Sequence, residues 1–238
     1  MTVGSRLNSA GIVMPSTFNG SAHDAVNKHL SRYMRLRELQ WKSFASGWNA
    51  VAYRARAAAE YDEEFTRSVA LSGSPEPEER FRQEQALFGF FICALSSLEC
   101  FFYSAYCIAS IINDKAFPIS TPENLRFKPE DVANKFADEF EGETISLRLG
   151  GCVRSPIYAE LREIRNVLAH RGSLPRAFSE GGEQDGSVMM PSTPAALSTL
   201  WNYDFAVDMK TTSKRQQWVS RTLWHLLASA EQFCMSKL

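Results

Sequence analysis

The feature that most limits how this sequence can fold is a long apolar stretch, Ala86 to Ile112, with one charged residue, Glu99. The stretch has 27 residues, and about 20 apolar residues are enough for a helix to cross a membrane. Glu99 near its middle, the scattered serines and the lack of a basic excess on one flank argue against such a span. We therefore predict a central helix from about Glu78 to Asn113, buried by its neighbours, and no membrane association. A helical, membrane-associated structural protein is the alternative.

Helical periodicity also marks the region before this stretch. Apolar residues recur at spacings of three, four and seven from Ser21 to Leu71, which predicts one long or once-bent helix with Gly47 as its main breaker. Ser21 and Asp24 resemble a capping box at its start.

Breakers and N-capping residues place the remaining helices. A Gly150-Gly151 break separates the middle of the chain from a third major helix, which begins at Ser155-Pro156 and ends by Gly172. A last helix runs from about Ser213 to the C-terminus. Two further helix starts are predicted, at Thr121-Pro122 and at Lys128-Pro129. The predicted fold class is all-α, an antiparallel bundle of about four to six helices.

The chain length of 238 residues suits one domain. We expect a flexible N-terminal segment over residues 1–20 and a single helical domain over residues 21–238. Glycine and proline interrupt residues 173–213, so we expect a long, irregular and weakly ordered insert before the last helix. Within it, apolar and polar residues alternate from Trp201 to Asp208, as in an extended segment packed on one face.

Charge and cysteine content narrow the function classes. With 26 basic and 27 acidic residues the net charge is −1, so any nucleic-acid site has to be local. Five cysteines without a C-x-x-C pair form neither a zinc framework nor an even set of disulfides, which favours a reducing compartment. No signal peptide is predicted in the first 22 residues, and we expect a cytoplasmic protein. No cluster of acids or histidines suggests a metal, and no cofactor is expected.

One predicted helix carries a pattern that goes beyond packing. On a helical wheel, Arg162, Arg165, Asn166 and His170 lie on the arc opposite its apolar residues. The window 145–177 holds six arginines, no lysine and two acids, and arginine without lysine suits bidentate phosphate recognition. The alternative is a solvated polar face whose last cations complement the helix dipole.

Arg165-Asn166 followed by His170 resembles the R-N-x-x-x-H form of the motif of the HEPN superfamily, a group of all-helical domains. The surrounding run from Tyr158 to Gly172 is also similar to that family. The resemblance implies a metal-independent endoribonuclease, in which the ribose 2′-hydroxyl attacks the adjacent phosphorus and leaves a 2′,3′-cyclic phosphate.

The resemblance also implies the site and its partners. Arg165, His170 and Asn166 would be the catalytic residues, with Arg162, Arg171 and Glu99 as supporting or RNA-binding residues. The partner would be RNA, and a homodimer would combine Arg165 and His170 of both protomers at its two-fold axis. An inhibitory partner protein would fit a toxin or defence system. The alternative within the family is a module that binds RNA, a nucleotide or a protein without cleavage.

Glu99 has a predicted role in this site. A carboxylate in an apolar helix needs a partner or a raised pKa. Arg162 or Arg165 could supply the partner if the two helices pack together, and we predict that Glu99 orients a motif arginine. The alternative is that Glu99 reaches solvent at a gap in the bundle.

Overall fold

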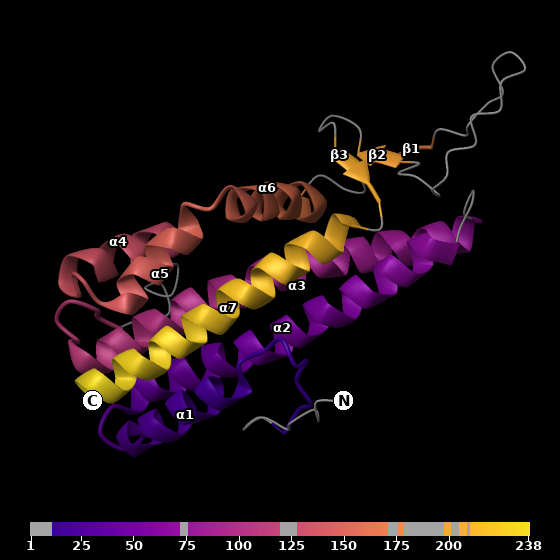
Figure 1. The fold of residues 1–238 in the computed structure, drawn as a ribbon. Coiled ribbons are helices and arrows are strands. Elements are labelled where there is room, and N and C mark those ends of the chain that lie inside the picture. The colour runs from indigo at the N-terminus through magenta and orange to yellow at the C-terminus, as the bar shows by residue number, and fades with distance from the viewer. Residues whose placement is uncertain are drawn as a thin grey trace, which may run out of the picture.

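The structure is a computed structural model that describes residues 11–71, 76–119, 128–170, 176–178, 198–200, 205–208 and 210–238. These form an all-α bundle, which confirms the predicted fold class (Figure 1). They contain seven α-helices, against the four to six expected, and three short strands. The helices are α1 (Gly20–Leu30), α2 (Glu38–Leu71), α3 (Pro77–Ile112), α4 (Pro129–Glu139), α5 (Thr144–Val153), α6 (Pro156–His170) and α7 (Lys210–Lys237), with a 3-10 turn, η1 (Ser31–Tyr33), after α1.

Helix α3 is the centre of the bundle. It pairs along its length with α2, and α4, α6 and α7 also pack against it. Figure 1 shows α2 and α3 as a long hairpin, with α7 running beside them and α6 above. Of its large side chains, Phe90, Phe91 and Phe101 are fully buried. In the described residues α3 is the one helix long and apolar enough to cross a membrane, and 61% of its most apolar window is buried inside the protein. Contact with neighbouring helices therefore accounts for its composition.

The predicted long helix before α3 is divided, and the division does not fall at Gly47. The chain leaves the helix after Leu30 and passes through the 3-10 turn η1 before α2 begins at Glu38. Gly47 lies inside α2, where a Cβ atom would come within 2.6 Å of Tyr103 Cδ1 and Ser104 Oγ of α3. Gly47 is thus required for the close approach of two helices.

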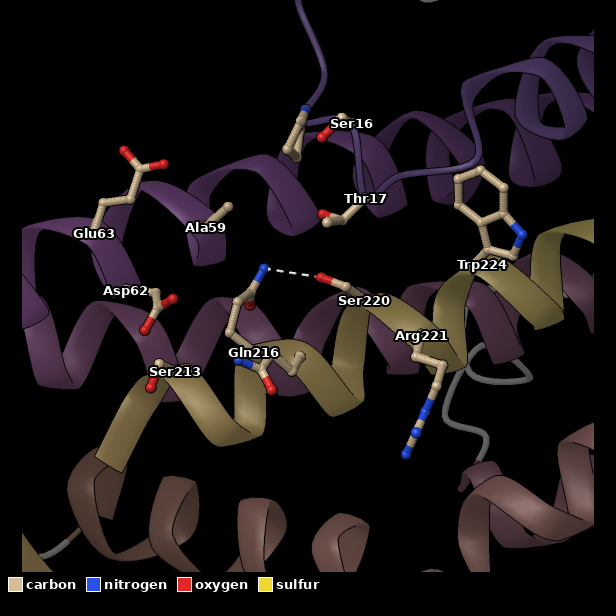
Figure 2. A pocket seen from close by; sticks show the side chains of 12 residues that line it. Ser16, Thr17, Ala59, Asp62, Glu63, Ser213, Gln216, Ser220, Arg221 and Trp224 are labelled. Atoms are coloured by element: carbon tan, nitrogen blue, oxygen red, sulfur yellow. Dashed lines mark hydrogen bonds between the residues drawn. The ribbon is translucent and has the colours of Figure 1, made fainter. Parts of the chain in front are cut away.

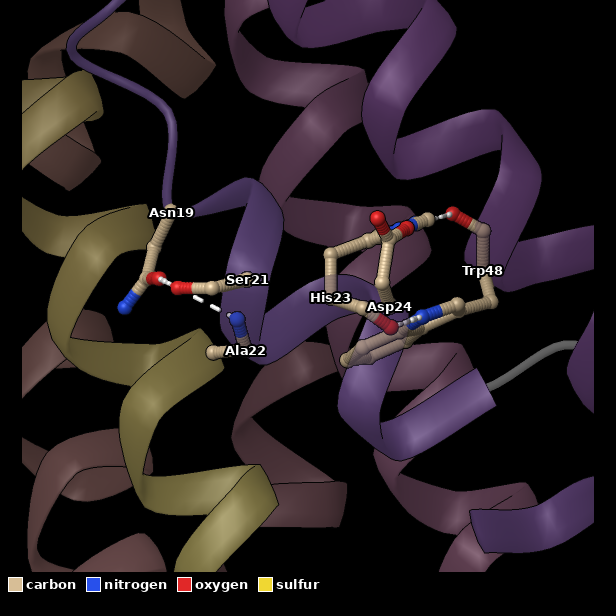
Figure 3. Close-up of polar contacts among 6 residues, drawn as sticks. All are labelled: Asn19, Ser21, Ala22, His23, Asp24 and Trp48. Carbon is tan, nitrogen blue, oxygen red and sulfur yellow. Dashed lines mark hydrogen bonds and ion pairs between the residues drawn. The ribbon is translucent and has the colours of Figure 1, made fainter. Parts of the chain in front are cut away.

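The start of α1 is held by a cap and by a contact with α2 (Figure 3). Asn19 caps the helix by accepting from the Ala22 N–H at 3.2 Å, so the predicted Ser21 capping box is wrong by two residues. His23 stacks on Trp48 of α2 with ring centroids 5.1 Å apart. The Trp48 indole N–H donates to the His23 carbonyl oxygen at 3.0 Å, and His23 Nε2 lies 3.1 Å from the Trp48 carbonyl oxygen. These reciprocal bonds fasten α1 to α2.

Other boundaries differ from the prediction in local ways. Gly150 and Gly151 continue α5 rather than break it, because the helix ends only at Val153. Helix α7 begins at Lys210, slightly earlier than expected. The predicted starts at Lys128-Pro129 and Ser155-Pro156 agree with α4 and α6, whereas Thr121-Pro122 lies outside the described residues.

The two segments expected to be poorly ordered are described in part. Residues 1–10 lie outside the described ranges, but Met14 and Phe18 are buried in the core. In the 173–213 insert, β1 (Arg176–Phe178), β2 (Ser198–Leu200) and β3 (Phe205–Val207) form an antiparallel sheet in the order β1-β2-β3. β3 lies within the predicted extended segment, of which Trp201 and Tyr203 lie outside the described residues.

The buried His23 predicts a stability that depends on pH. Burial lowers its pKa below the ordinary value of about 6.5. Between the two pKa values the unfolded chain binds a proton that the folded chain does not, so the free energy of unfolding should fall as the pH drops below about 6.5. Urea titrations from pH 7.5 to 5 measure this slope. His23→Gln should reduce the slope but not abolish it, because burial also lowers the pKa of His29. An unchanged slope in His23→Gln would contradict this, because it would mean that the pKa of His23 is the same in the folded and the unfolded chain.

Candidate functional site

Helix α6 carries the motif and has two distinct faces. Its inner face packs on α3 and α7, and the buried apolar residues of that face are Tyr158, Leu161, Ile164, Val167 and Leu168. The outer face holds exposed residues at helical spacing, namely Ala159, Arg162, Glu163, Asn166 and Ala169. The predicted amphipathic helix is therefore present, and Arg162 and Asn166 of its polar arc face away from the core.

Arg165 lies between these faces and meets the charge of the central helix. Its Nη2 donates to Glu99 Oε1 at 2.5 Å, joining α6 to the middle of α3. The two side chains are 24% and 34% exposed, so the pair is at the margin of the core, neither buried nor fully solvated. The predicted contact between Glu99 and a motif arginine is present, with Arg165 as the partner.

Arg162 makes a second ion pair one turn earlier. Its Nη1 bonds Glu130 of α4, and its guanidinium lies 5.8 Å from the centroid of the Tyr158 ring. The Tyr158 hydroxyl is buried and has no hydrogen-bond partner among the described residues. Burial, with the charges of Glu130 and Glu99, raises the pKa of Tyr158. Tyr158 is therefore a neutral phenol close to both ion pairs. We call this group the α6 charge cluster; it consists of Glu99, Glu130, Tyr158, Arg162 and Arg165.

The remaining motif residues are described unevenly. Asn166 is exposed on the outer face of α6. His170 is the last residue of α6, and its side chain lies outside the described residues, as does all of Arg171. The described part of the site thus brings together Arg162, Arg165 and Glu99.

The positive charge predicted for this region is compensated in part, at two of its six arginines. Arg162 and Arg165 face carboxylates from α4 and α3, which lie outside the 145–177 window. A third ion pair, missed from the sequence, joins Glu160 of α6 to Arg215 of α7 at 2.5 Å. Arg215 is only 12% exposed. In the sequence, however, nothing sets it apart from an arginine on the solvent face of a helix. Only the packing of α7 on α6 distinguishes it.

A cavity of about 550 Å³ lies on another part of the bundle (Figure 2). Its walls come from the segment before α1, from α2 and from α7, and include Thr17, Asp62 and Trp224. Burial raises the pKa of Asp62, whose Oδ1 has no partner among the described residues. None of the lining residues belongs to α6, so this cavity is separate from the motif.

Comparison with protein-family models, with curated proteins and with solved structures found no match to this chain. Within the described ranges no three His, Cys, Asp or Glu side chains are grouped so that they could hold a metal ion. The site is therefore defined by its own geometry: an exposed polar helix face, anchored by ion pairs to the helices beneath it.

The two ion pairs of the cluster should differ in their contribution to stability. Glu99→Gln leaves the more buried Arg165 without a counter-charge and should lower the free energy of unfolding by about 1–2 kcal/mol. Glu130→Gln acts on the more exposed Arg162 and should cost less than about 1 kcal/mol. Urea denaturation of both variants measures the difference. If the two variants lost the same free energy of unfolding, the lower exposure of the Glu99–Arg165 pair would not make it more stabilising than the Glu130–Arg162 pair.

Proposed function

We propose that this chain is a metal-independent endoribonuclease of the HEPN type. The observation that carries the proposal is the R-N-x-x-x-H pattern on α6, whose Arg165 is held by Glu99 of the central helix. The all-α bundle is compatible with this family, and the exposed position of Asn166 leaves the polar face open to a ligand.

The proposed reaction uses groups of matching chemistry. The ribose O2′ forms a bond to phosphorus, the P–O5′ bond breaks, and the products are a 2′,3′-cyclic phosphate and a 5′-hydroxyl. Imidazole titrates near neutrality, so His170 would take the proton from the 2′-hydroxyl or give one to the leaving oxygen. Arg165 would stabilise the negative charge that develops on the phosphoryl oxygens. Glu99 would fix the direction of that guanidinium.

A homodimer completes the proposed site. One histidine cannot at the same moment accept a proton and donate another, whereas His170 of two protomers could divide these roles. The outer face of α6 supports this arrangement, because Ala159 and Ala169 are exposed and small enough to let a second helix approach. Dimerisation, an inhibitory partner protein, a place in a toxin or defence system and a cytoplasmic location all belong to this proposal.

The test is cleavage of labelled single-stranded RNA by purified protein in EDTA. We expect products that end in a 2′,3′-cyclic phosphate, and a rate that falls on dilution below the dimer dissociation constant. His170→Ala should lower the rate by about 10²–10⁴-fold and Arg165→Gln by about 10²–10³-fold. Arg56→Gln, at an exposed arginine paired with Glu60 on α2, is the matched control and should cleave like the wild type.

Two results would contradict the proposal. Products that persist in His170→Ala would point to a contaminating nuclease. RNA binding without any product would support the module that binds RNA without cleaving it.

A further inference from the structure

A second cavity, of about 380 Å³, lies between α5, the start of α6 and α7. Its polar wall is formed by Arg148, Ser155, Arg221, Thr222 and His225. No acidic residue lines it. Neither its basic residues nor its hydroxyl residues were among the predicted site residues.

The basic residues of this cavity have no acidic partner in the part of the chain that the structure describes. Arg148, Arg221 and His225 are all exposed, and among the described residues no ion pair joins them to a carboxylate. The arginines of α6 differ in this respect, because Arg162 and Arg165 each face a glutamate. Among the described residues, the cavity therefore holds positive charge that no carboxylate pairs with, whereas Arg162 and Arg165 of the motif helix are both paired.

The side chains converge from separate helices. Arg148 comes from α5, while Arg221 and His225 lie one turn apart on α7. Figure 2 shows Arg221 extending from α7 on the side away from Trp224. Ser155 directly precedes Pro156, the first residue of α6, so the partial positive charge of a helix N-terminus adds to that of the side chains.

We propose that this cavity binds a phosphate group. Guanidinium groups match the oxygens of a phosphate bidentately, and the Ser155 and Thr222 hydroxyls supply further donors. The cavity volume falls within the range of small-molecule sites, about 300–1,000 Å³, so it admits more than a bare ion. Trp218 supplies an apolar wall for the remainder of the ligand. The phosphate could belong to a small phosphorylated molecule or to the backbone of an RNA, and the proposal does not depend on the activity of α6.

Isothermal titration calorimetry at low salt tests the site with three probes: inorganic phosphate, AMP and a short single-stranded RNA. We expect binding that weakens by about tenfold or more in the Arg148→Gln, Arg221→Gln double variant. Gly151→Leu tests the location independently of charge. Gly151 lines the cavity and a Cβ atom there meets no atom within 4 Å, so there is room for the side chain at its base, and we expect the leucine to take up space at the cavity wall. Arg154→Gln is the control. Arg154 is an exposed arginine next to Ser155 that does not line the cavity, so this variant should bind like the wild type.

Each outcome decides the proposal. Binding of phosphate and AMP that is lost in the double variant and in Gly151→Leu supports a site for a small phosphorylated ligand. The same pattern with RNA alone supports a site for a backbone phosphate. If no probe binds, if Gly151→Leu binds normally, or if Arg154→Gln weakens binding as much as the double variant, the proposal is overturned.

Discussion

A carboxylate in the middle of an apolar helix has to find a positive partner or lose its charge, and Glu99 of α3 finds Arg165 of α6. This pair links the most buried helix of the bundle to the helix that carries the motif. Because α3 is held on several sides by α2, α4, α6 and α7, the position of Glu99 is fixed by the whole core. The direction of the Arg165 guanidinium therefore depends on the packing of helices that are remote from it in sequence.

The same kind of contact organises the surroundings of α6. Glu130 of α4 faces Arg162, and Arg215 of α7 faces Glu160, so α4 and α7, like α3, each contribute one half of an ion pair to α6. Such pairs add little stability when exposed, but they specify how neighbouring elements face each other. The acids also reduce the positive charge of the motif face, while Arg148 and Arg221 keep theirs at the cavity beside α7. Phosphate recognition is thus proposed for two surfaces that differ in how their charge is balanced.

Local sequence signals predicted the helices better than the contacts between them. Pro129 and Pro156 marked helix starts correctly because proline fits the first helical turn wherever it occurs. Gly47 and Gly150 were misinterpreted as breakers, because the sequence does not show whether a glycine relaxes a helix or makes room for a neighbour. The Glu99 contact could be predicted since a lone charge in an apolar stretch demands a partner. The ion pair of Arg215 and the cavity lined by Arg148 and Arg221 could not be predicted. Both depend on residues far apart in the chain, which meet only because α5, α6 and α7 pack together.

The most direct test of the central claim, that Glu99 and Arg165 act as one unit, is a double-mutant cycle on the free energy of unfolding. Glu99→Gln, Arg165→Gln and the double variant are unfolded in urea beside the wild type. The structure predicts that the double variant is less destabilised than the sum of the single variants, with a coupling of about 0.5–3 kcal/mol. Effects that add to within about 0.3–0.5 kcal/mol would contradict the account, because they would mean that the two residues do not sense each other.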